Sequence, residues 1–349
     1  SLLFLLTALI VALFCMLTAL VANQPGAPMF PDTAVLWNEG WRSDNGTTPV
    51  LPCEIRPSQT KGRAILEKRL PETLPEDAVL VLRSNYLPVE AEVGGETLWV
   101  SGSFIQSGPF RLTYAGPASL VRLNAACAGQ TLRLTFHPGG SKTRMELHEV
   151  VLGSAEGVLT HYMLKDEFIT SFGWLLFALA MGMFLFSLIL NKFNAREFFL
   201  GFFYTSLSLL LTSVWVLSDI GACAVRYGHH SIYLFINLFS YLLVPVPILL
   251  LLRNYITRGG RALDALAVLT LLLNVAVVML CCLGIFDLSV TLTASHVLYV
   301  LVIWACFITL LRALREKGNP AARPLFVGML LSAVTGGITL ASFYLRQTP

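Results

Sequence analysis

The feature that most constrains this chain is a series of long stretches without a single charged residue. Six of them follow residue 167, and each is longer than 20 residues: 168–190, 198–218, 231–252, 265–286, 288–311 and 325–345. A helix needs roughly 20 apolar residues to cross the hydrocarbon layer of a bilayer. A buried helix of a soluble protein is shorter and amphipathic. The sequence therefore predicts a bundle of at least six transmembrane helices.

Residues 1–22 form a further uncharged stretch, which we interpret as an N-terminal transmembrane anchor or signal. Ala22 could precede a signal cleavage site, but Leu20 departs from the usual small-x-small pattern, which favours an uncleaved anchor. The chain begins without Met and without basic residues, so we expect its natural start to lie further upstream.

The segment between the anchor and the bundle, residues 24–167, has a different composition. The whole chain is 55% hydrophobic and only 13% charged, against about 25% charged in a soluble protein. Residues 24–167 carry charge at ordinary soluble density, so the low average arises from the flanking apolar blocks. We expect this segment to be a folded domain outside the membrane.

The connectors between the predicted spans alternate in charge. Connectors 191–197, 253–264 and 312–324 hold nine basic residues against three acidic ones. The basic residues are Lys192, Arg196, Arg253, Arg258, Arg261, Arg312, Arg315, Lys317 and Arg323. The intervening connectors carry only Asp219, Arg226 and Asp287. Basic loops stay in the cytoplasm, so the pattern predicts a cell-membrane protein with residues 24–167 extracytoplasmic.

Residues 24–167 have the alternating apolar and polar pattern of β-strands, separated by Gly- and Pro-containing turns. The expected strands are Ala64–Leu70, Ala78–Arg83, Val89–Val93, Thr97–Val100, Leu120–Leu123, Thr131–Phe136 and Arg144–Val151. Several short, regularly punctuated strands are typical of a sandwich or jelly roll. The predicted fold class is therefore an all-β extracytoplasmic domain joined to a membrane α-helical bundle.

Two resemblances follow from these segments. The run from Arg69 through Val100, with Gly94-Gly95, and the later run 128–134 resemble the galactose-binding-type jelly rolls, which bind sugars in some proteins and serve as scaffold in others. The order of anchor, β-domain and helices resembles the bacterial seven-transmembrane receptors with diverse intracellular signalling modules. This resemblance implies a cytoplasmic output, such as a GGDEF-type diguanylate cyclase or a histidine kinase. It also implies a seventh helix, so we expect the chain to be truncated before its effector.

The cysteines and histidines give little indication of a disulfide or a metal site. Cys53 and Cys127 both lie in the external domain, where a disulfide between them is permitted. No Cys or His spacing matches a zinc site, and the adjacent His229 and His230 point about 100° apart on a helix. We therefore expect no metal site.

Ligand-binding candidates are the aromatic and polar residues of the external domain. Aromatic faces stack on sugar rings, and arginine recognises carboxylates. Strand ends are where binding loops lie, which favours Arg83, Asn85 and Tyr86, followed by Arg111 and Tyr114. Other candidates are Trp37, Trp41, Trp99 and His137, although Trp37 and Trp99 have apolar neighbours that favour a core position.

The bundle itself contains few polar residues, notably Asn237, Asn274 and His296. The asparagines could join helices by hydrogen bonds, and Pro245 with Pro247 should kink their helix.

Catalytic and cofactor-binding motifs are absent from the sequence, so we expect no cofactor and no enzymatic activity in this chain. No basic-aromatic pattern indicates nucleic acid.

The sequence thus favours a bacterial sensory receptor that binds a carbohydrate, a carboxylate or an extracellular protein. The sequence is also compatible with a homodimer. The alternatives are a membrane enzyme of envelope or polysaccharide metabolism, and a transporter with an accessory external domain.

Overall fold

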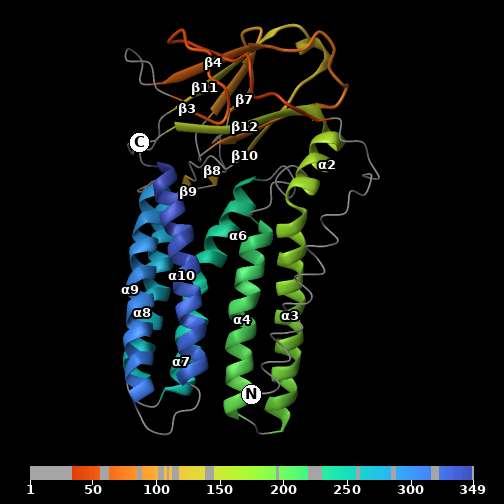
Figure 1. Ribbon diagram of the computed structural model, residues 1–349. Coiled ribbons are helices and arrows are strands. Elements are labelled where there is room, and N and C mark those ends of the chain that lie inside the picture. Colours follow the sequence, from red (N-terminus) through yellow and green to blue (C-terminus); the bar gives the residue numbers. More distant parts are fainter. Residues whose placement is uncertain are drawn as a thin grey trace.

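The computed structural model describes residues 34–55, 63–84, 89–100, 106–107, 110–111, 118–137, 145–193, 196–218, 230–256, 260–283, 288–315 and 322–347. The predicted anchor at residues 1–22 lies outside these ranges. The described chain forms a β-sandwich at one end of a bundle of long helices (Figure 1).

Two antiparallel sheets of five strands each make up the sandwich within the described residues. The first sheet has the order β1 (Val35–Leu36), β12 (Met145–Ser154), β5 (Ala78–Ser84) and β10 (Ala118–Arg122), and β3 (Cys53–Ile55) also pairs with β12. The second sheet has the order β2 (Arg42–Ser43), β4 (Ala64–Arg69), β11 (Thr131–Phe136), β6 (Val89–Val93) and β7 (Glu96–Val100). The predicted sandwich is confirmed, and each of the seven expected strands is present within a few residues of its expected bounds.

The short strands were not expected. They are β1, β2 and β3, together with the pair β8 (Gln106–Ser107) and β9 (Phe110–Arg111). Two or three residues are too few to establish an alternating pattern, so the sequence gives no periodic signal for them. The short 3-10 helix η1 (Ala125–Cys127) joins β10 to β11 and is capped by Asn124.

The sandwich core lies between the two sheets because alternate strand residues point inward. On β11 the inward residues are Leu132, Leu134 and Phe136, all fully buried. On β5, by contrast, every residue from Ala78 to Leu82 is buried. The reason is that both faces of β5 are covered. Leu80 and Leu82 join the core, while Val79 and Val81 pack beneath a helix on the outer face.

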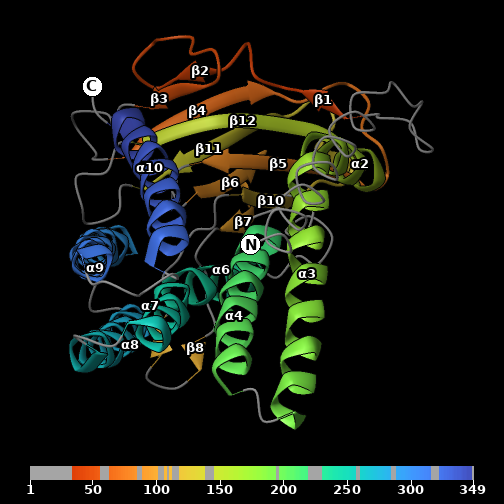
Figure 2. The same cartoon turned by 60° about the horizontal axis from the view of Figure 1, so that its bottom comes forward.

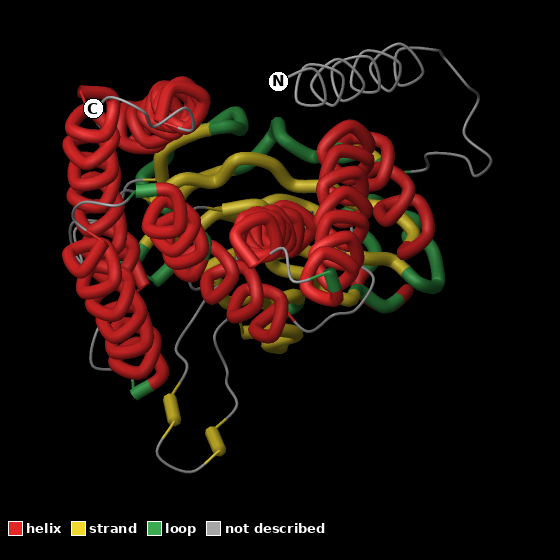
Figure 3. Tube along the Cα trace, turned by 90° about the horizontal axis from the view of Figure 1, so that it is seen from below, coloured by secondary structure: helices red, strands yellow, loops and turns green. Residues whose placement is uncertain are grey.

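That helix is α2 (Ala155–Lys165), which lies against β12 and β5 and leads directly into α3 (Figure 2). The bundle comprises α3 (Glu167–Lys192), α4 (Arg196–Ser218), α6 (His230–Leu243), α7 (Pro245–Tyr255), α8 (Gly260–Cys282), α9 (Leu288–Arg315) and α10 (Ala322–Gln347). Seen from below, several helices are viewed nearly end-on with the strands behind them (Figure 3).

Five spans in the described chain are helices long and apolar enough to cross a membrane: Glu167–Lys192, Phe198–Ser218, Ile236–Tyr255, Gly260–Leu280 and Ala294–Arg315. They correspond to the first five predicted spans of the bundle. The sixth predicted span falls within α10, whose described apolar segment is the shorter Ala322–Leu331. At the prolines the helix is divided, because α6 ends at Leu243 and α7 begins at Pro245, although Val244 keeps helical backbone angles. The expected kink stays a prediction.

Candidate functional site

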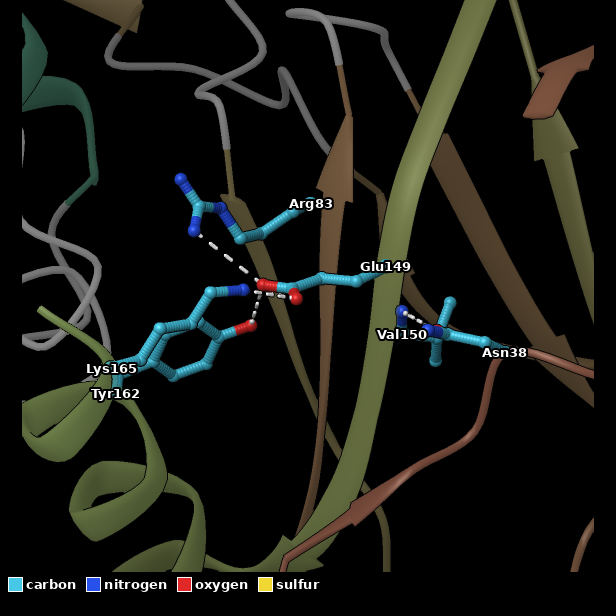
Figure 4. Close-up of polar contacts among 6 residues, drawn as sticks. All are labelled: Asn38, Arg83, Glu149, Val150, Tyr162 and Lys165. Atoms are coloured by element: carbon cyan, nitrogen blue, oxygen red, sulfur yellow. Dashed lines mark hydrogen bonds and ion pairs between the residues drawn. The ribbon is translucent and has the colours of Figure 1, made fainter. Parts of the chain in front are cut away.

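A charged cluster lies where the sandwich meets its outer helix, and it contains one residue of the predicted ligand site, Arg83. Arg83 is the second-to-last residue of β5 and faces Glu149 directly across the strand pair β5–β12. Its Nη1 donates to Oε1 of Glu149 over 3.5 Å. The arginine that the sequence assigns to a ligand carboxylate is therefore already engaged by a carboxylate of the chain (Figure 4).

An irregularity in β12 determines which way Glu149 points. The pairing with β5 shifts between Leu147 and Glu149, which makes His148 an extra residue in the strand. Such a bulge reverses the alternation beyond it. Leu147 points into the core, and so do Val150 and Leu152 after the bulge. Glu149 consequently lies on the outer face of the sheet, under α2.

Helix α2 starts at a well-formed cap at the end of β12. The side chain of Ser154 accepts a hydrogen bond from the Gly157 amide at 3.0 Å, the usual role of serine at this position. Asp77 adds a bond of 3.1 Å from the Ala155 amide to its carboxylate. The helix then buries Val158 and Tyr162 on the outer face of the sheet. The strand thus fixes both the origin and the direction of the helix.

Three side chains converge on the carboxylate of Glu149, which is only 7% exposed. The Tyr162 hydroxyl donates to Oε1 over 3.2 Å, and the Lys165 ammonium donates to Oε2. Arg83 completes the set. We name Arg83, Glu149, Tyr162 and Lys165 the Glu149 cluster. It joins β5, β12 and the last turns of α2 through one carboxylate, as Figure 4 shows.

The protonation of the cluster follows from its surroundings. Burial alone raises the pKa of Glu149, but the hydrogen bond and charge of Lys165, the charge of Arg83 and the Tyr162 hydroxyl outweigh burial, so the pKa lies below its ordinary value. Burial and the neighbouring carboxylate raise the pKa of Tyr162. Glu149 is therefore ionised and Tyr162 neutral near pH 7, the states that their hydrogen bond requires.

The cluster continues into the membrane without a flexible linker. A single residue, Asp166, separates α2 from α3. The amide of Asp166 donates to the Tyr162 carbonyl at 3.0 Å, and its carbonyl accepts from the Thr170 amide at 2.8 Å. Both bonds have the i to i−4 spacing of an α-helix. A displacement of β12 relative to β5 would thus reach α3 through hydrogen-bonded structure.

Of the other predicted ligand residues, Arg111 alone lies within the described ranges. Asn85, Tyr86 and Tyr114 lie outside the described residues. Arg111 lies on β9, whose described pairing is with β8, away from both large sheets. The prediction of a site built from all five residues stays untested.

The remaining candidates are occupied within the domain. Trp41 is fully buried in the core, and Trp37 and Trp99 pack against it, which confirms the core interpretation of Trp37 and Trp99. His137 lies 3.5 Å from the carboxylate of Glu90.

The possible disulfide between Cys53 and Cys127 is not formed in this structure, in which both are free thiols. Cys53 pairs with Leu147, which pairs with Ser84 at one end of β5. Cys127 follows Leu123, whose amide bonds to Ala78 at the other end. Six strand steps of about 3.3 Å separate those ends, whereas a disulfide requires Cα atoms within roughly 7 Å.

A second polar feature, absent from the sequence-based candidates, is a lysine at an inward strand position. Lys68 on β4 follows the same alternation as the core residues Ala64 and Leu66. Its ammonium lies 3.9 Å from the ring centroid of Trp37 and 5.6 Å from that of Trp41. Burial lowers the pKa of Lys68 to about 8, although Glu39 opposes the shift. The lysine therefore packs against the tryptophans at this edge of the sandwich core.

The sequence contained partial signals for the Glu149 cluster. Glu149 is the one acidic residue in the apolar run from Leu147 to Leu152. Tyr162 and Lys165 stand three residues apart just before the first span, so they share a helix face. The strand register that places Arg83 opposite them could not be read from these spacings.

Comparison of the chain with protein-family profiles gives no match, and comparison with curated proteins gives none either. The class of protein therefore follows from the fold and from the hydropathy of its helices. A two-sheet sandwich is joined, through α2, to a series of helices of membrane-spanning length and hydropathy. The chain is a multi-pass membrane protein with an extramembrane β-sandwich domain.

Proposed function

We propose that this protein is a membrane receptor of bacterial type, whose β-sandwich lies outside the cytoplasm and passes a binding event to the bundle through α2 and α3. The observation that carries the proposal is the unbroken connection of β12, α2 and α3, held to the sheet by the Glu149 cluster. An external domain that sends no signal to the membrane helices does not require a rigid linker to them. A receptor requires one, because a loose linker would absorb the displacement.

The proposed signal is a shift between two arrangements of the helices, favoured differently by the free and bound domain. Helix α3 packs along α4, and α4 packs on α6 and α7. A movement of α3 would therefore reach the centre of the bundle. The output would be a cytoplasmic signalling module of the diguanylate cyclase or histidine kinase type, as the resemblance to seven-transmembrane receptors implies.

The ligand class follows from the strand-end residues. Arg83, Asn85 and Tyr86, with Arg111 and Tyr114, are our candidates for contacting a carbohydrate or a carboxylate. Arg83 supports the carboxylate alternative, because it already holds Glu149 and could exchange this partner for a ligand carboxylate. Such an exchange would loosen the Glu149 cluster and thereby connect binding to the position of α2.

The rival functions have less support. Ion-coupled transporters carry ionisable residues on their pathway through the membrane, and the six uncharged stretches contain no Asp, Glu, Lys or Arg. A membrane enzyme would need a cluster of catalytic groups. The Glu149 cluster does not suit this role, because its carboxylate already accepts from three donors.

The test uses the whole chain in lipid nanodiscs and a library of sugars and carboxylates. A ligand of the folded domain raises its melting temperature, and a receptor ligand should also change hydrogen exchange in α3 and α4. Tyr86→Ala should abolish both effects. Two glycines inserted between Lys165 and Asp166 should preserve the thermal shift and abolish the response of α3 and α4.

Two results would contradict the proposal. A ligand that shifts the melting temperature but leaves α3 and α4 unchanged in the unmodified chain would reduce the domain to a binding module. A response of α3 and α4 that survives the glycine insertion would show that the signal bypasses α2. If no compound shifts the melting temperature, the small-ligand class is rejected and a protein partner becomes the next candidate.

A further inference from the structure

The third helical crossing of the described bundle, counted as α6 and α7 together, loses backbone hydrogen bonds near its middle because of its own sequence, although Val244 keeps helical backbone angles. Helix α6 ends at Leu243, Val244 separates the two helices, and Pro245 opens α7. In a continuous helix the amide of residue 245 would bond to the carbonyl of Tyr241. Proline has no amide hydrogen, so the Tyr241 carbonyl cannot accept that bond, and it accepts a 3.3 Å bond from the Val244 amide instead.

Side chains from two other helices reach the carbonyls at this break. The Tyr299 hydroxyl, from α9, donates to the Tyr241 carbonyl. The Asn274 amide nitrogen, from α8, donates to the Leu242 carbonyl. An unbonded carbonyl in the interior of a membrane bundle is costly, and neighbouring side chains commonly compensate for it at proline breaks. Tyr299 therefore supplies the donor that Pro245 lacks, and Asn274 adds a bond from α8 at the neighbouring carbonyl.

The two halves of this helix share α4 as a neighbour but differ in their other contacts. Asn237 on α6 donates to the Trp215 carbonyl of α4 at 3.2 Å, and the Trp215 ring packs on Tyr241. Helix α7 instead buries Leu249 and Leu252 in a cluster shared with α8, α9 and α10. Helix α4 packs on both segments, so what distinguishes α7 is its additional packing on the second half of the bundle.

The contacts on α8 are incomplete in this arrangement. Asn274 is 2% exposed, and its Oδ1 has no hydrogen-bond partner among the described residues. The same holds for Oγ1 of Thr270, fully buried one turn earlier on the same helix. Buried polar atoms without partners are unfavourable. These two atoms therefore offset part of the stability that the bonds from Tyr299 and Asn274 contribute.

We propose that the α6–α7 break is a hinge within the membrane, and that Tyr299 and Asn274 are its latches. Opening the hinge changes the angle between α6 and α7 while α7 keeps its packing on α8 and α9. The inference stands independently of the receptor proposal, because it concerns the bundle alone.

A double-mutant cycle on the full chain in nanodiscs tests the latch. Tyr299→Phe removes the hydroxyl and keeps the ring. With Pro245 present, we expect the folded-to-unfolded ratio to fall roughly tenfold. In a Pro245→Ala background the restored amide can bond to Tyr241, so the same change should lower the ratio less than about twofold. Thr309→Val, which removes a hydroxyl bonded within α9, is the matched control and should act alike in both backgrounds.

Distance measurements between spin labels test the motion itself. Ile236→Cys on α6 and Val268→Cys on α8 place labels at exposed positions, in a chain whose seven native cysteines have been replaced. Tyr299→Phe and Asn274→Leu should each broaden the distance distribution, and Pro245→Ala with Pro247→Ala should narrow it. An equal loss of stability from Tyr299→Phe in both backgrounds would overturn the latch. Unchanged distributions in all variants would overturn the hinge.

Discussion

Glu149 and Tyr162 join the last strand of the sandwich to the helix that leads into the membrane, through a hydrogen bond of 3.2 Å from the tyrosine hydroxyl to the carboxylate. The two residues stand only 13 positions apart, yet the contact depends on the bulge at His148, which turns Glu149 to the outer face. This contact, with Lys165 and Arg83, fixes α2 to the sheet, and it leads to two predictions.

The first prediction concerns the loss of the carboxylate. Glu149→Ala leaves Arg83 and Lys165 facing each other and the buried Tyr162 hydroxyl without its acceptor, so the domain should lose about 1–3 kcal/mol of stability. Thermal unfolding of the full chain in nanodiscs, followed by tryptophan fluorescence, would measure the loss. Glu146→Gln, on the same strand, is the control and should change stability by less than about 0.5 kcal/mol. Equal effects of the two substitutions would mean that the cluster contributes nothing specific.

The second prediction concerns acid. Because the folded pKa of Glu149 lies below its ordinary value, the unfolded chain takes up the proton first as the pH falls. The stabilisation is complete above the ordinary pKa of 4.5 and is lost as the pH falls through the lower folded pKa. Melting temperatures measured from pH 6 to pH 3 should therefore fall more steeply for the unmodified chain than for Glu149→Gln. Parallel curves would refute a depressed pKa.

A third prediction concerns alkaline pH and Lys68. Its folded pKa of about 8 lies below the ordinary 10.5, so between these values the unfolded chain binds a proton that the folded chain does not. The contribution of Lys68 to stability should therefore rise with pH across this window. Subtracting the melting temperatures of a Lys68→Met variant from those of the unmodified chain isolates the effect. A difference that stays flat from pH 8 to pH 10.5 would show that the two tryptophans keep the ammonium charged.

A fourth prediction concerns the contact of α3 with α4. A Cβ atom added to Gly173 would lie 2.7 Å from Cδ2 and 2.9 Å from Cγ of Leu217, closer than atoms pack. Gly173→Ala should therefore separate the two helices and lower stability by roughly 1–3 kcal/mol. Gly182, on the same helix, has no atom within 4 Å of such a Cβ. Gly182→Ala should be neutral or stabilising by up to about 1 kcal/mol. Similar losses for both variants would argue against a close approach at Gly173.

The sequence by itself determined the features that depend on local pattern. Uncharged stretches of more than 20 residues predicted the membrane helices, because the thickness of the bilayer sets a length that few other structures require. Alternation predicted strands such as Thr131–Phe136, because successive side chains in a strand point to opposite faces. Pro245 predicted its own break, because a missing amide hydrogen acts on the same helix.

Only the tertiary structure decided which distant residues meet. Arg83 and Glu149 are 66 residues apart, and Tyr241 and Tyr299 are 58 apart. Their contacts depend on strand register, on one extra residue at His148 and on helix packing. The possible disulfide depends on the same register, which places Cys53 and Cys127 toward opposite ends of β5. Periodicity shows which face of an element a residue occupies, but pairing across elements is set by the packing of the whole domain.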